Sequence, residues 1–431
     1  MEYGLIGKPL KHSFSKEIHG LIAEYKYELR EIDPSFFDEF MLKRDFKAIN
    51  VTIPYKKKAF AKVPKTHIDA RSIGAVNTIV NVNGELFGFN TDIYGVIGTF
   101  KYNGIDLKNK NVLILGTGAT SDTVYAACKK CMAKNIYKAY RESSKVKGDV
   151  LYKDIESISK DINIIINTTS YGTYPDIFEK PLIDLALFKK LEFVMDVVYN
   201  PLRTKLLLSA EKRGIKTSSG LYMLIAQAVY ASKLFLDENI QKSWNEEELF
   251  TNKQKGEIEK EIERIYKSHI LAKTNIVFTG MPSSGKSTLG EKIAEELDRE
   301  FIDTDVLIKE KTNMDPGTYI EQKGEEGFRK IESEVIKEIA ARTGVVISTG
   351  GGAILNEENV DNLKLYGKIF FLNRNIDSLE PSNDRPLTKT QEQLEKVYNK
   401  RLPIYKKTCD EEIEFDKNID KEVKKVLDKF K

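Results

Sequence analysis

The stretch GMPSSGKST, residues 280–288, has the form G-x-x-x-x-G-K-[ST]. The apolar run NIVFTG leads into it and LGEKIAEEL follows it, so the stretch joins a strand to a helix. Gly280 and Gly285 let the backbone approach the phosphates of a nucleotide, whose charge meets the N–H groups at the start of the helix. Lys286 is then placed for the β- and γ-phosphates and Ser287 for Mg²⁺. The stretch therefore predicts a nucleotide-binding α/β domain rather than a Gly/Ser turn that only caps a helix.

Length and composition limit the remaining choices. The chain has 431 residues, of which 41% are hydrophobic and 31% charged, and its formal net charge is +3. This length predicts roughly two to four domains, and the composition is typical of a globular protein. The small net charge argues against nucleic acid as a partner. Because no apolar run reaches membrane-spanning length and the first residues lack a secretion signal, we expect a cytoplasmic protein that binds no membrane.

Short apolar runs alternate with helical patterns along the whole chain, which predicts parallel sheets with crossover helices. The charged stretch 242–267 interrupts this alternation, and Ile258, Ile262 and Ile265 recur within it at helical spacing. We interpret it as part of a helical linker between two halves of the chain. Three cysteines and four histidines are too few for a framework of disulfides or zinc sites.

Residues suited to phosphoryl transfer follow the glycine-rich loop along the chain. Asp303 and Asp305 in FIDTD end an apolar run and, in an extended segment, lie on the same face. One carboxylate could reach Mg²⁺ through water while the other holds an acceptor hydroxyl. The segments FRKIE, DRPL and KRLPIY add Arg329, Arg385 and Arg401, and arginines suit bidentate recognition of a carboxylate or a phosphate.

Together with STGGG at 348–352, these segments stand in the order found in shikimate kinases, and the second half of the chain resembles that family throughout. The resemblance implies a P-loop kinase that uses Mg²⁺ and transfers a phosphoryl group from ATP to shikimate. Ser287 and Asp303 would serve Mg²⁺, and Arg385 would lie on a lid over ATP, although its segment is short for that family's lid. The shikimate ligands implied are Asp305, Arg329, Gly351 and Arg401. The residues implied to contact ATP are Gly280, Ser283, Ser284, Gly285, Lys286, Ser287, Thr288 and Arg385, with Lys286 also catalytic.

A second glycine-rich turn lies in KNVLILGTGATSDTVYAACKKC, residues 110–131, which is typical of the start of a dinucleotide-binding unit. Gly116 and Gly118 match the first two glycines of the fingerprint, whereas the third is not at the position that a strict pattern requires. Arg141 follows about 25 residues after Gly116, where the ribose is recognised. An arginine there suits the 2′-phosphate of NADP, but the adjacent Glu142 would suit NAD, so the residues favour NADP and leave NAD open.

A hairpin is predicted by VNTIVNVNGELFGFNTD, in which Asn83-Gly84 is a two-residue turn signal between apolar runs. Counting back from this turn puts Asn77 opposite Asn90, with Asp92 diagonal to Asn77 on the same face. An amide beside a carboxylate at the open end of a hairpin suggests a polar pocket, and a solvated loop end is the alternative.

The order of several further segments matches the shikimate dehydrogenases over nearly all of residues 1–238. These segments are GLIGKPLKHSFSKEIHG, NVTIPYK, GAVNTIV, FNTD, NTTSYG, DVVYNPLRT and GLYMLIAQA. The resemblance implies reduction of 3-dehydroshikimate to shikimate with NADPH, with Lys56 and Asp92 as the catalytic pair. The other implied ligands of the substrate are Ser13 and Ser15 for its carboxylate, and Thr52, Asn77 and Gln227, with Asp92, for its ring hydroxyls. The implied NADP-binding residues are Gly116, Gly118, Ala119, Arg141, Tyr199 and Met223.

The chemistry agrees with these residue types, because an alkoxide that develops from a ketone needs a proton and a nearby positive charge, which Lys56 can supply. Two departures concern the cofactor. GTGATS has Ala119 where the family usually has glycine, and YRES, which contains Arg141, stands where Asn-Arg-Thr is usual.

The two resemblances imply a fusion of shikimate dehydrogenase and shikimate kinase that uses NADP(H), ATP and Mg²⁺ and acts on 3-dehydroshikimate and then on shikimate. The expected fold is an α/β substrate domain with a Rossmann NADP-binding domain, followed by a P-loop kinase domain of α/β/α layers. The expected domains are 1–100 for substrate binding, joined by a returning helix at 220–238, then 101–219 for NADP, a charged helical linker at 240–271, and the kinase at 272–431. Two alternatives are a catabolic quinate or shikimate dehydrogenase fused to a kinase, and a non-catalytic metabolite sensor.

Overall fold

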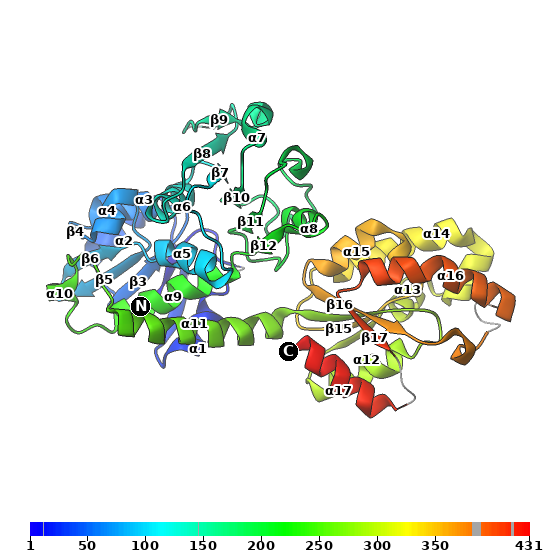
Figure 1. Cartoon of the computed structure of the whole chain (residues 1–431). Helices are drawn as coiled ribbons and strands as arrows, with labels where there is room; N and C mark the ends of the chain where they lie inside the picture. The colour runs from blue at the N-terminus through cyan, green and yellow to red at the C-terminus, as the bar shows by residue number, and fades with distance from the viewer. Residues whose placement is uncertain (12, 145, 382–388, 415–417) are drawn as a thin grey trace. The chain divides into compact units, whose positions relative to one another are not determined.

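The computed structural model describes residues 1–11, 13–144, 146–381, 389–414 and 418–431 (Figure 1). The chain forms two compact units. Unit 1 consists of Met1–Asn200 and Leu206–His269, and unit 2 consists of Pro201–Lys205 and Ile270–Lys431. The α/β fold class agrees with the sequence prediction.

The first sheet of unit 1 has the strand order β2-β1-β3-β5-β6-β4. Its strands are β1 (Tyr3–Gly7), β2 (Tyr27–Glu31), β3 (Ala48–Val51), β4 (Lys65–Thr66), β5 (Thr78–Val82) and β6 (Glu85–Phe89). Strand β1 pairs in parallel with β2 and β3, whereas β5 is antiparallel to both β3 and β6. This sheet is therefore mixed: the hairpin predicted from the sequence supplies β5 and β6, and its first strand runs antiparallel to β3 beside the parallel strands β1, β2 and β3.

The hairpin of β5 and β6 has the predicted register, with Val82 opposite Glu85. Asn83 and Gly84 both have positive φ angles, 53° and 87°, as a two-residue turn of this kind requires. Asp92, however, begins helix α5 (Asp92–Tyr102) and is not part of an extended segment. The prediction that Asp92 lies on the same strand face as Asn77 is therefore wrong, because the chain turns into a helix directly after Thr91.

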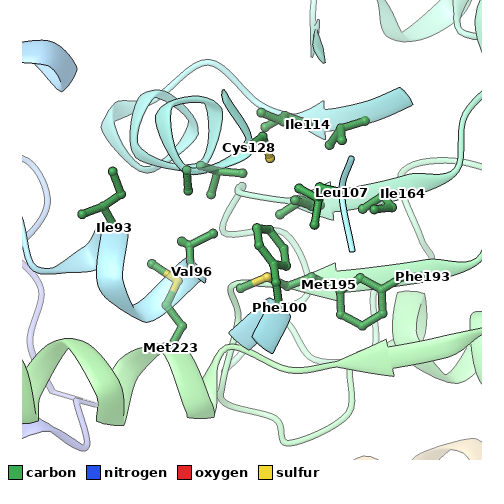
Figure 2. Close-up of a cluster of buried hydrophobic side chains, with 14 of the residues drawn as sticks. Ile93, Val96, Phe100, Leu107, Ile114, Cys128, Ile164, Phe193, Met195 and Met223 are labelled. Carbon is green, nitrogen blue, oxygen red and sulfur yellow. The ribbon is translucent and has the colours of Figure 1, made fainter. Parts of the chain in front are cut away.

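The second sheet of unit 1 is parallel, with the order β12-β11-β10-β7-β8-β9. Its strands are β7 (Asn111–Leu115), β8 (Asn135–Tyr140), β9 (Val150–Leu151), β10 (Ile164–Asn167), β11 (Phe193–Asp196) and β12 (Lys216–Ser218). One face packs against α5 and α6 (Ala119–Lys130) through a buried apolar cluster that includes Phe100, Leu107, Ile164 and Phe193 (Figure 2). Parallel strands with covering helices are the arrangement expected of a Rossmann unit.

Unit 2 contains a parallel sheet with the order β14-β15-β13-β16-β17. Its strands are β13 (Asn275–Thr279), β14 (Phe301–Asp303), β15 (Val346–Ser348), β16 (Gly367–Asn373) and β17 (Glu411–Glu414). Successive residues of β13 enter different clusters. Val277 joins the core under α14 (Pro316–Ile339), α15 (Glu357–Lys364) and α16 (Gln391–Thr408), and Phe278 joins the core under α12 (Lys286–Glu296) and α17 (Ile419–Phe430). Since side chains alternate along a strand, this sheet is covered on both faces.

The helices not yet given bounds that lie wholly or mainly in unit 1 are α1 (Ser15–Ile22), α2 (Phe37–Lys43), α3 (Lys56–Lys62), α4 (Ile68–Ile73), α7 (Glu156–Ser159), α8 (Lys205–Glu211), α9 (Leu221–Phe235), α10 (Ile240–Ser243) and α11 (Asn252–Lys273). Unit 2 also contains α13 (Thr304–Thr312). Short 3₁₀ helices lie at Tyr152–Asp154, Leu185–Leu187, Ala353–Leu355 and Ile376–Ser378. Among the described helices, none is long and apolar enough to cross a membrane.

Helix α11 lies where the isoleucine spacing predicts a helix, and Ile258, Ile262 and Ile265 are all buried. Lys101 of α5 pairs with Glu259 of α11 at 2.6 Å, which adds a polar contact beside the apolar stripe. The residues of α11 up to His269 belong to unit 1. This part of the charged segment is therefore packed on unit 1, and its apolar stripe is the reason.

Candidate active sites

The centre of the candidate site in unit 1 is an ion pair between two helix starts. Lys56 is the first residue of α3 and Asp92 the first of α5, and Lys56 Nζ lies 2.6 Å from Asp92 Oδ2. Only 9% of Lys56 and 5% of Asp92 is exposed. Charged groups that are removed from water need a partner of opposite charge, and here Lys56 and Asp92 are partners of each other. The structure thus brings together the two residues that the resemblance makes catalytic.

A buried polar network adjoins this pair. Asn77 Oδ1 accepts a hydrogen bond from the Thr91 backbone N–H at 2.7 Å, and Asn77 Nδ2 donates to Thr91 Oγ1 at 3.0 Å. Gln227 of α9 reaches the same amide, with 3.4 Å between Asn77 Nδ2 and Gln227 Oε1. Thr52 follows β3 and is half-buried. Thr91 was missed from the sequence, and its signal was its place inside FNTD, between candidate residues on both sides.

The serines at the start of α1 form another group with Tyr199. Ser13 Oγ donates to Ser15 Oγ at 3.1 Å, and the ring of Phe14 between them lies 5.2 Å from the ring of Tyr199. Burial raises the pKa of Tyr199, while hydrogen bonds with Ser13 and the Phe14 backbone act in the opposite direction. Two hydroxyls on one short segment can bind the two oxygens of a carboxylate.

The turn before α6 fits a dinucleotide phosphate. Gly116 has φ +111°, and a Cβ there would lie 2.9 Å from Thr168 Oγ1, so the turn requires glycine. Gly118 caps α6 without a side chain, and of the described residues none comes within 4 Å of where its Cβ would be. Ala119 is the first residue of the helix, whose first-turn N–H groups have no partner within the helix and suit a phosphate.

The remaining two cofactor candidates are Arg141 and Met223. Arg141 follows β8, and its guanidinium lies 6.0 Å from the centre of the Tyr171 ring. The carboxylate of the neighbouring Glu142 pairs with Lys153. Met223 lies at the start of α9 and is largely buried in the apolar cluster shown in Figure 2.

In unit 2 the loop between β13 and α12 has the shape of a phosphate cradle. Gly280 and Gly285 have φ angles of +151° and +89°, which glycine adopts without strain, and Ser283 between them also has a positive φ of +61°. Lys286 starts α12 and is buried, and its Nζ donates to the carbonyls of Met281 at 2.8 Å and Gly280 at 3.1 Å. Ser284 is buried, and Thr288, the third residue of α12, is exposed. The loop fits the phosphates of a nucleotide.

A carboxylate and a second hydroxyl lie beside the hydroxyl of Ser287, the residue after the loop lysine. Ser287 Oγ donates to Asp303 Oδ2 at 2.6 Å and lies 3.2 Å from Ser348 Oγ. A carboxylate and hydroxyls are the kind of ligands that Mg²⁺ takes, directly or through water, so the residues fit this ion. Ser348 was missed from the sequence, although a serine that closes the apolar strand before Gly350 was a usable signal.

Asp303 and Asp305 do not lie on one face of an extended segment, so that prediction is wrong. Asp303 ends β14 and caps α13, and its Oδ1 accepts the backbone N–H of Asp305 at 2.9 Å. An aspartate at this position satisfies an otherwise unpaired N–H, and this favours the helix over a longer strand. Asp305 therefore lies in the first turn of α13.

The glycine run after β15 lies among charged side chains from three helices. A Cβ on Gly350 would lie 2.9 Å from Asp305 Oδ1, and one on Gly351 would lie 3.3 Å from Arg401 Nη1. A Cβ on Gly352 would overlap the guanidinium of Arg329 at 2.2 Å. The implied shikimate ligands thus surround one short backbone segment. Arg385, the proposed lid residue, lies outside the described residues.

Glu332 lies beside the same glycine run, and the sequence interpretation gives it no role. It is 1% exposed, and Arg329 Nη1 lies 2.8 Å from Glu332 Oε2. Burial raises the pKa of Glu332, and attraction to Arg329 opposes that rise. Glu332 stands one helical turn after Arg329 in FRKIE, so the i, i+3 spacing was the signal that could have found it.

Comparisons with known proteins match both halves of the chain. The shikimate kinase family matches residues 282–431, and the family described as shikimate dehydrogenase substrate binding domain matches residues 5–79. A shikimate dehydrogenase (NADP(+)) of Caldanaerobacter subterraneus subsp. tengcongensis is 35% identical over 265 residues, which cover 56% of this chain and 94% of that protein.

Solved structures agree with this. Shikimate dehydrogenase 1 from Peptoclostridium difficile matches with a TM-score of 0.52 and 28% identity, over 62% of this chain and 98% of that one. A chorismate mutase/shikimate 5-dehydrogenase fusion protein from Clostridium acetobutylicum matches with a TM-score of 0.52 and 30% identity, over 62% of this chain and 96% of that one. The chain therefore belongs to the shikimate dehydrogenase family in its N-terminal part and carries a shikimate kinase domain, residues 282–431, at its C-terminus.

Proposed function

We propose that unit 1 reduces 3-dehydroshikimate to shikimate with NADPH and that unit 2 phosphorylates the 3-hydroxyl of shikimate with ATP and Mg²⁺. The observation that carries this proposal is that each unit brings the central groups of its reaction into contact. Lys56 and Asp92 meet at 2.6 Å in unit 1, and Ser287 and Asp303 meet at 2.6 Å beside Lys286 in unit 2.

In the dehydrogenase site, NADPH supplies the hydride when it is bound. As the ketone is reduced, negative charge develops on its oxygen, and the positive charge of Lys56 stabilises it. Lys56 then gives this oxygen a proton. Asp92 accepts a hydrogen bond from Lys56 Nζ and so fixes the direction of the ammonium group. Because both groups are buried, their interactions are stronger than they would be in water.

The remaining polar groups of unit 1 orient the substrate. Ser13 and Ser15 bind its carboxylate, which leaves the amides of Asn77 and Gln227 and the hydroxyl of Thr52 for the ring hydroxyls. Such positioning lowers the barrier because the ketone is held against Lys56 before reaction begins. Asn77 is itself held by Thr91, so its amide has a fixed orientation.

In the kinase site, ATP with Mg²⁺ supplies the phosphoryl group when it is bound. Lys286 and the backbone N–H groups of the loop neutralise phosphate charge, and Ser287 and Asp303 hold the metal ion. Asp305 accepts the proton of the substrate hydroxyl, while Arg329 and Arg401 bind the substrate carboxylate. Arg385 would add positive charge from the lid.

NADP is the proposed cofactor of unit 1. Arg141 lies at the end of β8, where the ribose is recognised, and its guanidinium suits a 2′-phosphate. Glu142, which would suit the free hydroxyls of NAD, is engaged by Lys153 instead. The relative from Caldanaerobacter carries NADP(+) in its name.

A non-catalytic sensor is not favoured, because it needs only binding groups. The chain keeps the groups that act on reacting atoms or metal, among them Lys56, Asp92 and Lys286, and the structure pairs the first two. A catabolic quinate dehydrogenase is distinguished by its substrate.

Separate assays test the proposal. Purified protein should oxidise NADPH when 3-dehydroshikimate is added, and should release ADP from ATP and Mg²⁺ only when shikimate is added. In the reverse dehydrogenase direction, shikimate with NADP⁺ should react faster than quinate with NAD⁺. Binding of these ligands without turnover would instead indicate a sensor, and faster quinate oxidation would indicate the catabolic enzyme.

A further inference from the structure

Asp122 in the first turn of α6 contacts one lysine from each of the two parts of unit 1. Its Oδ2 lies 2.7 Å from Nζ of Lys57, which belongs to α3 beside the first sheet. Its Oδ1 lies 2.7 Å from Nζ of Lys138, which belongs to β8 of the second sheet. One carboxylate therefore connects the substrate-binding part of unit 1 to the part with the dinucleotide fold.

The surroundings favour a defined geometry for this bridge. The side chains of Asp122 and Lys138 are 24% and 19% exposed, and Lys138 Nζ lies 4.9 Å from the centre of the Tyr125 ring. Lys138 thus holds Asp122 in place before Lys57 binds it, so less side-chain freedom is lost when the bridge forms. A carboxylate near the start of a helix is also favoured by the helix dipole.

The position of Lys57 gives the bridge a consequence for chemistry. Lys57 follows Lys56 directly, and α3 ends after only seven residues. The side chain of Lys57 is 52% exposed, and its ion pair with Asp122 is a contact between this turn and α6. Helix α6 is also the helix whose first N–H groups fit the cofactor phosphate.

We propose that Asp122 is a positioning residue for ketone reduction. By holding Lys57 it fixes the first turn of α3, and with it the Lys56 ammonium group, relative to the helix that binds the cofactor. This inference rests on the dehydrogenase function proposed above. It gives a role to Lys57, which stands between Lys56 of the proposed catalytic pair and the exposed Lys58.

A double-mutant cycle tests the proposal, using Lys57→Ala, Asp122→Ala and the double variant. Each single change should lower kcat/KM for 3-dehydroshikimate about three- to tenfold, the range for a partly shielded ion pair. The double variant should fall no lower than the worse single variant. Kinase turnover of the same protein should not change, and Lys58→Ala, which removes an exposed charge from the same helix, should leave both activities intact.

A second measurement separates this inference from the proposed function. Backbone hydrogen exchange within α3 should be faster in Lys57→Ala and Asp122→Ala than in the unaltered chain or in Lys58→Ala. Multiplicative losses in the double variant, or unchanged exchange in α3, would overturn the bridge. If the unaltered chain reduced no ketone, the proposed function would fail, whereas faster exchange in both variants would still support the bridge.

Discussion

Lys56 and Lys286 both stand at the first position of a helix, and both are buried beside oxygen atoms. Lys56 faces the carboxylate of Asp92, and Lys286 faces the carbonyl groups of its own loop. A buried ammonium group is unfavourable without such partners. The two lysines therefore mark the two chemical centres, and each can be removed without altering the other unit.

Lys56→Ala should lower dehydrogenase turnover by about 10²- to 10⁴-fold, the usual contribution of a general acid or base. Kinase turnover should stay within about twofold of the unaltered chain, because Lys56 belongs to unit 1. Steady-state assays of both reactions on one preparation measure this. A folded variant that lost both activities would contradict the assignment of separate sites.

Lys286→Ala should have the opposite effect. Kinase turnover should fall about a hundredfold or more, because a cation that stabilises phosphate charge is lost. Reduction of 3-dehydroshikimate should continue, so shikimate should accumulate. Equal kinase activity in the variant and the unaltered chain would show that Lys286 does not act in phosphoryl transfer.

His19 gives unit 1 a sensitivity to acid. Its ring is buried and stacks on Tyr27 at 3.8 Å, and burial lowers its pKa from 6.5 to about 3. In the unfolded chain this histidine binds a proton below about pH 6.5, whereas in the folded chain it does not until about pH 3. The free energy of unfolding should therefore fall by about 1.4 kcal/mol per pH unit as the pH drops through this range.

Denaturant titrations followed by the fluorescence of Trp244, the chain's single tryptophan, test this in unit 1, where Trp244 contacts Phe87. In His19→Gln, the slope of the free energy of unfolding against pH between pH 6 and pH 4 should be smaller by the contribution of about one proton. An identical pH dependence in the variant would mean that His19 is protonated in the folded chain.

At this scale the sequence predicts residue types better than positions. Lys56 stands in a run of three lysines, and only the approach of α3 to α5, which are distant in sequence, buries it against Asp92. Local cues can also mislead. Asp303 and Asp305 are two apart, as on a strand, but Asp303 caps α13 and places Asp305 in a helix.

Among the elements, α11 depends on a narrow apolar stripe. Ile258, Ile262 and Ile265 are nearly fully buried, while many of the residues around them are charged. Ile262→Ala should lower the free energy of unfolding of unit 1 by about 2–4 kcal/mol, because it removes buried methyl groups and leaves a cavity. Lys267→Ala, on an exposed position of the same helix, is the matched control and should change stability by less than about 0.5 kcal/mol.

Trp244 fluorescence during denaturant unfolding again measures unit 1. If Ile262→Ala and Lys267→Ala were equally stable, α11 would not be packed on unit 1 through its isoleucine stripe, and the segment would be a solvated linker.

Elements with strong local signals were predictable from the sequence. The Asn83-Gly84 turn fixes the register of β5 with β6, and the isoleucine spacing predicts the helix at α11. What the sequence could not give was the partner of each element. The antiparallel pairing of β5 with β3 depends on contacts between residues far apart along the chain, and periodicity contains no information about them.

In the whole molecule, two units of one chain carry out consecutive reactions, and the product of the first is the substrate of the second. Linking two sites raises the local concentration of one near the other, but each unit has its own core and its own set of chemical groups. The two reactions should therefore be separable by the single substitutions described above.

The most direct test is one coupled assay on the purified chain. With 3-dehydroshikimate, NADPH, ATP and Mg²⁺ supplied together, shikimate 3-phosphate should form, and it should not form when NADPH or ATP is left out. Lys286→Ala should stop the sequence at shikimate, and Lys56→Ala should stop it before shikimate. Folded protein that yields no shikimate 3-phosphate from the complete mixture would contradict the assignment of both activities to this chain.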